Sequence, residues 1–420
     1  MSYPRYREYK DSGEPTVGAI PSTWRIARVG DVAHVINGYP FDARLFDDGG
    51  IHPLIRIRDL GASETATRYC GEFVESAAVR SSDVLIGMDG DFNVGRWKGT
   101  GPALLNQRMC CIRASSSVVV RYLEFVLPGS LRIINDLTYA TTVKHLSSSQ
   151  VEKIRVALPP TDVELIYVVD FLDRETAKID ALVAEQEQLI TLLKEKRQAV
   201  ISHAVTKGLD PSVPMKDSGV EWLGEVPAHW SVTPLRWVAS CRSGEGLAAT
   251  EVEASPDEAH TVPVVGGNGL MGYTDAATVD HQVLAVGRVG ALCGNVHVVS
   301  PPAWITDNAL IVDPDLCVFD IHFLSAVLRI RNLNDIASKT AQPLITGTQV
   351  SDQRLPAPPI DEQRAIVEHL SNLTTSYSGL INEAVLSIEL LRERRSALIS
   401  AAVTGQIDVR GLAPAQEQAA

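Results

Sequence analysis

The chain has 420 residues, 45% of them apolar, and a formal net charge of −13. This length predicts two or three domains, each able to bury its own core. No apolar run approaches the ~20 residues that cross a bilayer, and the polar start of the chain does not resemble a secretory signal, so we expect a cytoplasmic protein without membrane contact. Six cysteines without a CxxC pair favour reduced thiols over disulfides or a zinc site.

The charge is unevenly distributed along the chain. Residues 1–160 carry 19 lysines and arginines against 17 aspartates and glutamates, whereas residues 208–360 carry 8 against 17. A protein that binds nucleic acid by itself usually presents a basic face. The balance therefore argues against autonomous DNA binding, but it permits a DNA reader whose partner contacts the phosphates.

A short motif opens the chain and returns about two hundred residues later. Lys-Asp-Ser-Gly followed by Gly-x-x-Pro-x-x-Trp spans residues 10–24 and again residues 216–230. We expect Trp24 and Trp230 to be structural anchors that pin this loop to its domain. The recurrence indicates an internal repeat.

Each copy then reads as short strands separated by glycine- and aspartate-rich turns. In the first copy, residues 84–86 predict a buried strand, residues 88–97 a loop, and residues 122–137 a helix. The second copy has the same order of elements with a different sequence. Strands are expected at residues 262–265, 283–286 and 309–312, and a helix at residues 321–337.

A long helix is predicted after each copy. Pro159 and Pro160 can stand before a helix but not inside one, Thr161 and Glu164 fit a capping box, and Gly208 fits a terminating glycine. The second helix follows another Pro-Pro pair and is expected to start on Asp361. Apolar residues recur on both helices at a period near 3.5, which predicts pairing with another helix. The positions expected to pair the helices or dock partners are Leu172, Ile179, Ile190, Leu193, Leu373, Leu380, Leu391 and Leu398.

These elements predict an α+β protein with two mixed α/β domains. The domains are expected to be separated by a long antiparallel pair of α-helices, a coiled coil, in a pseudo-two-fold internal repeat. The predicted boundaries are 1–160 for the first domain, 161–208 for the central helix, 209–359 for the second domain, 360–405 for the C-terminal helix and 406–420 for a flexible tail.

The motif search finds no catalytic constellation. Residues 267–272 spell GxGxxG after a strand, but neither the helix nor the acidic residue that a dinucleotide site needs follows. A glycine-rich turn is the better interpretation. No phosphate-binding loop, nuclease motif or metal-spaced histidine cluster is present. We therefore expect a non-catalytic chain with no metal and no cofactor of its own.

Side chains that can read base edges occur in the predicted loops of both copies. Arg and Lys suit guanine and Asn and Gln suit adenine, because their donors and acceptors match those edges. For any one of these residues, an ordinary solvated or structural role is the alternative. The candidates are Asn93, Arg96, Lys98, Asn106, Gln107, Arg108, Lys144, Asn268, Arg288, Asn295, Asn308, Lys339 and Gln342.

The ordered pairs of motifs resemble the specificity subunit of a type I restriction–modification system over essentially the whole chain. The resemblance rests on the twin opening motifs, the Pro-Pro hinges before Glu164 and Glu362, and the two endings of the form basic-Ala-x-Ile-Ser-x-Ala-Val-Thr. It implies two target recognition domains that each read one half of a bipartite site in double-stranded DNA. It also implies helices that dock two adenine-N6 modification subunits.

In that family, the modification subunits bring S-adenosylmethionine, and a restriction motor-nuclease subunit uses ATP and Mg. None of this chemistry would lie in this chain. Two alternatives stay open: a non-catalytic coiled-coil scaffold with two ligand-binding domains, and the specificity subunit of a related methyltransferase–nuclease system.

Overall fold

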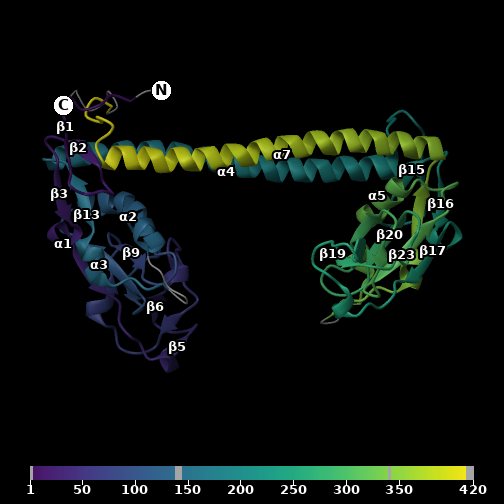
Figure 1. Cartoon of the computed structure of the whole chain (residues 1–420), viewed down its shortest axis with the longest axis horizontal. Coiled ribbons are helices and arrows are strands. Elements are labelled where there is room, and N and C mark those ends of the chain that lie inside the picture. The colour runs from purple at the N-terminus through teal and green to yellow at the C-terminus, as the bar shows by residue number, and fades with distance from the viewer. Residues whose placement is uncertain (1–2, 138–143, 339–341, 413–420) are drawn as a thin grey trace. The chain divides into compact units, whose positions relative to one another are not determined.

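The computed structural model describes residues 3–137, 144–338 and 342–412. The chain divides into two compact units: residues 1–186 with 387–420, and residues 187–386. Two long helices, α4 (Asp162–Lys207) and α7 (Ile360–Val403), each contribute one part to the first unit and one part to the second (Figure 1).

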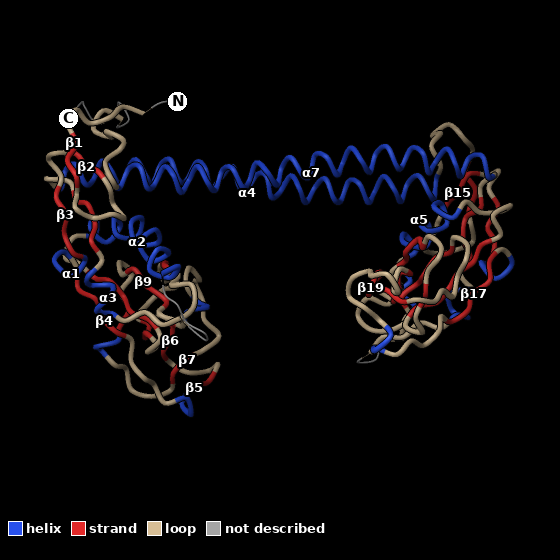
Figure 2. The backbone as a smooth tube through the Cα atoms, viewed as in Figure 1, coloured by secondary structure: helices blue, strands red, loops and turns tan. Residues whose placement is uncertain are grey.

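The first unit contains two larger sheets and two short strand pairs (Figure 2). One sheet has the order β10-β9-β12-β4, with β4 (His34–Asn37), β9 (Val84–Gly87), β10 (Val94–Gly95) and β12 (Met109–Arg113). The other has the order β5-β7-β6-β11-β8, with β5 (Phe46–Asp47), β6 (His52–Ile55), β7 (Arg68–Tyr69), β8 (Ala78–Val79) and β11 (Ala103–Leu105). The pairs are β1 (Tyr9–Asp11) with β2 (Ala19–Pro21) and β3 (Arg25–Arg28) with β13 (Arg155–Leu158). Its shorter helices are α1 (Val29–Val32), α2 (Ser117–Leu137) and α3 (Ser148–Lys153).

The second unit repeats the order of the four-stranded sheet, while its other sheet has three strands where the first unit has five. One sheet runs β17-β23-β20-β21, with β17 (Ala239–Ser243), β20 (Val283–Gly287), β21 (Val296–Val299) and β23 (Ala309–Pro314). The other runs β19-β18-β22, with β18 (Val262–Gly266), β19 (Gly269–Thr274) and β22 (Trp304–Ile305). The pairs are β14 (Met215–Asp217) with β15 (Glu225–Pro227) and β16 (Ser231–Pro234) with β24 (Arg354–Ala357), and the short helices are α5 (Ile321–Arg331) and α6 (Gly347–Ser351).

Among the residues that the structure describes, each unit also has a parallel pairing between two named strands at an equivalent place. β6 pairs parallel with β11 in the first unit, as β18 does with β22 in the second. The α+β class and the four strands expected at residues 84–86, 262–265, 283–286 and 309–312 are confirmed.

Several helix boundaries differ from the sequence prediction. The helix expected over residues 122–137 begins at Ser117, and the C-terminal helix expected to reach residue 405 ends at Val403. The helix expected over residues 321–337 ends at Arg331, because Asn332 adopts a left-handed conformation (φ 50°) and a short 3-10 helix (Leu333–Ile336) follows. The second long helix begins at Ile360, one residue before the predicted Asp361. Gly208 ends α4 with φ 76°, as its position predicts.

The core of the first unit joins the sheet, α2 and both long helices. Tyr122 of α2 is fully buried, and its hydroxyl lies 2.6 Å from the carbonyl oxygen of Ala157 and 2.9 Å from that of Val403. Burial raises the pKa of Tyr122, so the phenol stays protonated and can donate. This side chain ties the domain to the end of α7.

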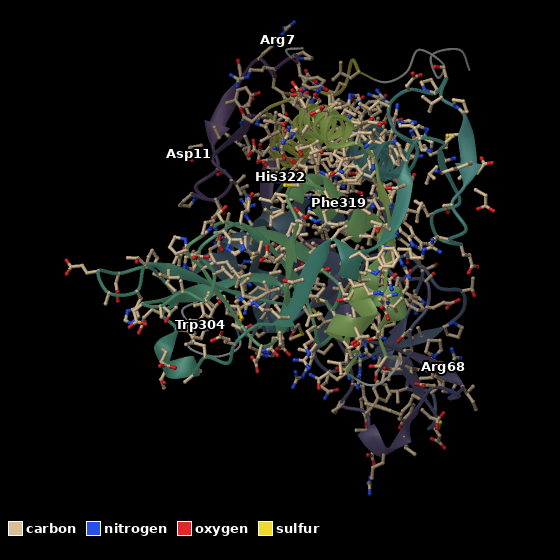
Figure 3. The ribbon with its side chains drawn as sticks, turned by 90° about the vertical axis from the view of Figure 1, so that its right-hand side faces the viewer. Arg7, Asp11, Arg68, Trp304, Phe319 and His322 are labelled. Atoms are coloured by element: carbon tan, nitrogen blue, oxygen red, sulfur yellow. The ribbon has the colours of Figure 1, made fainter. Side chains whose placement is uncertain are left out.

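The core of the second unit is built around α5. Phe319 is fully buried beside Phe323, with ring centroids 6.3 Å apart and nearly parallel planes. His322, in the first turn of α5, is exposed instead; Figure 3 labels Phe319 and His322. The buried residues of α5 recur at helical spacing and form the face that packs against the sheet.

Glu164, in the first turn of α4, holds the opening segment of the chain. Its Oε1 accepts hydrogen bonds from the Trp24 indole (2.9 Å) and the Tyr6 hydroxyl (2.6 Å), and all three side chains are buried. Thr161 caps the helix through its hydroxyl, 3.2 Å from the Glu164 amide. The predicted capping box is therefore half formed, because the glutamate side chain turns to Trp24 instead.

The second unit repeats this contact at the start of α7. Trp230 is fully buried, and its indole donates to Glu362 Oε1 at 3.1 Å. The other carboxylate oxygen lies 2.8 Å from His229 Nε2. The predicted anchoring role of both tryptophans is confirmed.

The long helices pack together within each unit. In the first unit, Leu172, Ile179 and Leu398 share one core, and Arg395 Nε donates to Asp180 Oδ1 at 2.8 Å. In the second unit, Ala204 and Val205 of α4 share a core with residues of α7, namely Ile366 and Leu370.

The remaining predicted pairing positions divide by exposure. Ile190, Leu193, Leu373 and Leu391 are half-buried. Leu380 is 49% exposed, and the neighbouring Ile381 is half-buried in its place. The exposure of Leu380 argues against a helix-pairing role, because the buried face of α7 runs one residue further along here, and its role in partner docking stays a prediction.

The predicted flexible tail is wrong for residues 406–412. Ile407 and Val409 are buried, and the Asp408 amide donates to the Pro4 carbonyl at 2.8 Å. Arg410 lies over the Tyr6 ring, 4.6 Å from its centroid. This segment closes over the start of the chain, and residues 413–420 lie outside the described part.

Glu164→Ala should destabilise the first unit by about 2–4 kcal/mol, because the Tyr6 hydroxyl and the Trp24 indole would lose their buried acceptor. Urea unfolding, followed by hydrogen exchange across residues 20–28, measures the loss. Glu185→Ala, on an exposed face of α4, is the control and should stay within about 0.5 kcal/mol. Equal effects of the two substitutions would contradict the role assigned to Glu164.

Candidate nucleic-acid interface

A tight turn joins the two sheets of the first unit. It leaves β11, passes through Asn106, Gln107 and Arg108, and enters β12. The Asn106 amide donates to the Ile55 carbonyl (3.1 Å), and the Met109 amide donates to the Asn106 carbonyl (3.0 Å). Main-chain bonds hold the turn, so the exposed side chains of Gln107 and Arg108 are free to face outward.

The second unit builds the same turn between β22 and β23. The Thr306 amide donates to Val265 (2.9 Å), and the Ala309 amide donates to Thr306 (2.9 Å). The two residues at its tip, Asp307 and Asn308, are exposed.

A second loop lies beside each turn. In the first unit, the amides of Gly87, Met88 and Gly90 donate to the carbonyls of Asn93 (2.9 Å), Arg108 (2.9 Å) and Lys144 (3.1 Å). In the second, the corresponding amides of residues 287, 288 and 290 donate to the carbonyls of residues 295, 308 and 343, at 2.8 to 2.9 Å. Three segments far apart in sequence thus meet at one end of β9, and three meet at one end of β20. We call these groups the two turn clusters.

Three of the seven candidates in the first unit are partly or fully buried and hydrogen-bonded to other groups of the chain. Arg96 Nε donates to Glu124 Oε2 at 2.6 Å. Lys144 Nζ donates to the Asn135 carbonyl (2.6 Å) and Oδ1 (2.7 Å). Asn106 is buried, and its Oδ1 accepts from the Arg108 amide at 3.2 Å. The exposed candidates are Asn93, Lys98, Gln107 and Arg108.

Arg108 has an acidic neighbour that sequence reasoning did not identify. Its Nη1 lies 3.5 Å from Asp89 Oδ2, and Asp89 Oδ1 lies 2.8 Å from His145 Nδ1. The only sequence signal was an Asp-Gly pair soon after a buried strand, which indicates a turn and not a charge partner. His145 thus fixes the carboxylate that faces Arg108.

The candidates of the second unit gather around its turn cluster. Asn295 Nδ2 donates to Asn268 Oδ1 at 3.3 Å, and Arg288 Nη1 donates to Ser243 Oγ at 3.1 Å. Asn308 and Gln342 are exposed. The candidate Lys339 lies outside the described residues.

The GxGxxG sequence forms a hairpin turn between β18 and β19, with strand on both sides. Residues 269–274 continue as strand β19 and not as the helix that a dinucleotide site needs, so the interpretation of this sequence as a glycine-rich turn fits the structure. Gly269 has φ 97°, and a Cβ there would lie 3.4 Å from the ring of His297. Burial and the nearby Arg329 lower the pKa of His297, which favours its neutral ring beneath the turn.

No group of three metal-ligating side chains occurs among residues 3–137, 144–338 and 342–412. In the same part of the chain, no helix is both long and apolar enough to cross a membrane. The six cysteines, all within it, are free thiols.

Two units of matching strand order, each with exposed polar side chains on a turn cluster, define a modular recognition protein. The family profile described as "Type I restriction modification DNA specificity domain" matches residues 21–191 and 253–389. The chain belongs to this family, the specificity subunits of type I restriction–modification systems, which recognise the DNA target.

Similar proteins span nearly the whole chain. The specificity subunit of type I restriction enzyme EcoBI from Escherichia coli is 27% identical, over 93% of this chain and 87% of its own length. The specificity subunit of enzyme MjaVIII from Methanocaldococcus jannaschii is 21% identical, over 94% of this chain and 95% of its own length.

Two solved structures share the fold. A chain from a study of complex assembly and conformational transition of the type I R-M system gives a TM-score of 0.69 at 17% identity, covering 92% of this chain and 99% of its own. The HsdS subunit from Thermoanaerobacter tengcongensis gives a TM-score of 0.50 at 16% identity, covering 92% and 98%.

Gly38→Ala should disrupt the first turn cluster, since the added Cβ would lie 1.9 Å from the Asn106 carbonyl oxygen. Separating these backbone atoms should destabilise the first unit by about 1–3 kcal/mol, as measured by urea unfolding. Gly129→Ala in α2 meets nothing within 4 Å, and it should be neutral or stabilising by up to about 1 kcal/mol. A neutral Gly38→Ala would contradict the close approach.

Proposed function

We propose that each unit reads one half of a bipartite DNA target, so that this specificity subunit sets the sequence that a restriction–modification complex methylates. The observation that carries the proposal is the pair of turn clusters. They share a main-chain hydrogen-bond pattern and differ in the side chains at their tips. A duplicated frame with different exposed side chains suits the recognition of two different half-sites.

The two long helices are proposed to form an antiparallel coiled coil that relates the units by a pseudo-two-fold repeat. The pairing contacts inside each unit support this arrangement, because Asp180 near the middle of α4 meets Arg395 near the end of α7. In the second unit, the end of α4 shares a core with the start of α7.

The outer faces of these helices are proposed to dock two adenine-N6 modification subunits. Several large apolar side chains on α4 and α7 are exposed to water: Leu182, Leu189, Leu192, Leu380, Leu386 and Leu390. Apolar side chains gathered on an otherwise charged helix mark a protein-binding surface. Leu380, which does not pair the helices, would belong to this docking surface.

The acidic character of the second copy supports a complex in which other subunits make most of the contacts with the DNA phosphates. Residues 208–360 carry 8 basic against 17 acidic side chains, and phosphate contacts dominate the affinity of most DNA-binding proteins. The modification subunits would supply much of that contact, together with S-adenosylmethionine. A motor-nuclease subunit would bring ATP and Mg for cleavage.

Co-expression with the modification subunit of its own system should produce adenine-N6 methylation at one bipartite sequence. We expect this methylation only when both chains are present, as read by methylation-sensitive sequencing of the host DNA. Methylation by the modification subunit alone, or at a single undivided site, would defeat the proposal.

Leu390→Glu should weaken capture of the modification subunit at least tenfold, because it places a charge on the proposed docking face. Ile51→Glu is the matched control, since Ile51 is 73% exposed and Leu390 is 65% exposed, but Ile51 lies outside the helices. Size-exclusion chromatography of the mixed subunits compares them. Equal retention of the partner by both variants would remove Leu390 from the interface.

A further inference from the structure

The two turn clusters make one position of the first unit equivalent to one position of the second. The carbonyl of Arg108 accepts from the amide of Met88, and the carbonyl of Asn308 accepts from the amide of Arg288, both at 2.9 Å. Each residue stands second in a two-residue tip that follows a parallel-paired strand and precedes the central strand of the other sheet. Arg108 and Asn308 thus occupy the same place in two like frames.

Resting on the proposed function, we infer that Arg108 selects a guanine in the half-site of the first unit and Asn308 selects an adenine in the half-site of the second. A guanidinium donates two hydrogen bonds to guanine O6 and N7. A carboxamide donates to adenine N7 and accepts from its N6 amine. The shared frame presents these two chemistries at matching positions.

The surroundings of Arg108 orient it without consuming its donors. The guanidinium side chain is 69% exposed, and its ion-pair partner Asp89 is only 18% exposed. Asp89 is also held by His145, at 2.8 Å. A carboxylate fixed on one side of a guanidinium restricts its rotamers and leaves the other nitrogens for a base, which lowers the entropy cost of binding.

The surroundings of Asn308 differ in the way that an adenine reader requires. Val289 follows Arg288 where Asp89 follows Met88, so no carboxylate faces the tip from that loop. Within the described part of the chain, the Asn308 carboxamide makes no hydrogen bond and is exposed. Its donor and acceptor are both available to one base edge.

Arg108→Ala and Asn308→Ala test the inference in the complex with the modification subunit. A DNA library randomised over the target is methylated, and the methylated sequences are read. Arg108→Ala should reduce discrimination for one guanine, in one half-site, by about 10- to 100-fold. Asn308→Ala should do the same for one adenine in the other half-site. In each variant, the untouched half-site reports that the complex is folded and active.

Two further variants sharpen the assignment. Asp89→Asn should reduce discrimination at the same guanine as Arg108→Ala, but by a smaller factor. Arg25→Ala removes an equally charged, exposed side chain on β3, and it should leave the motif unchanged.

The possible results separate the inference from the proposed function. A wild-type complex that methylates no bipartite motif contradicts the proposed function. A wild-type motif that survives Arg108→Ala or Asn308→Ala unaltered overturns the inference alone. So does a variant whose methylation falls equally at all sequences with a reduced salt dependence, because that result marks a phosphate contact.

Discussion

An indole-to-carboxylate hydrogen bond joins each folded domain to the long helix that follows it. Trp24 donates to Glu164 at 2.9 Å, and Trp230 donates to Glu362 at 3.1 Å. Both indoles are fully buried, where an unpaired N–H would be costly. The opening motif and the first turn of the helix are distant in sequence, but each needs the other for hydrogen bonding. The domain and its own part of the helix therefore pack as one body, and each tryptophan lies in a core that includes residues of that helix.

Under the proposed function, the residues that stabilise each turn cluster differ from those that would read DNA. Within each turn cluster, backbone amides and carbonyls hold the loops, and buried residues such as Asn106 support the turn from inside. The exposed tips contribute little to this support. The two long helices have buried faces that pack within the units, and leucines such as Leu192 are exposed on their other faces. Under the proposed function, these exposed leucines would dock the partner subunits.

The sequence predicted the repeated elements because they depend on local patterns. Buried strands, the Pro-Pro hinges and the terminating Gly208 each follow from the chemistry of a few neighbouring residues. The contact of Asp89 with Arg108 could not be predicted in this way, because it joins loops from different strands. Lys144 shows the converse, since it has the composition of a base reader but is bound to Asn135. Residues 406–412 were predicted to belong to a flexible tail, but Ile407 and Val409 are buried and the Asp408 amide donates to the Pro4 carbonyl at the start of the chain.

The main-chain bonding of the tips bears on how such a chain changes over generations. Every residue has a backbone carbonyl, and every residue except proline has an N–H donor, so replacement by residues other than proline at positions 107, 108, 307 or 308 keeps the main-chain bonds that shape each loop. Substitutions at these positions can therefore accumulate during evolution with little loss of fold stability. Under the proposed roles, a single codon change at one of these positions could alter the DNA sequence recognised by one unit and leave the other half-site unchanged.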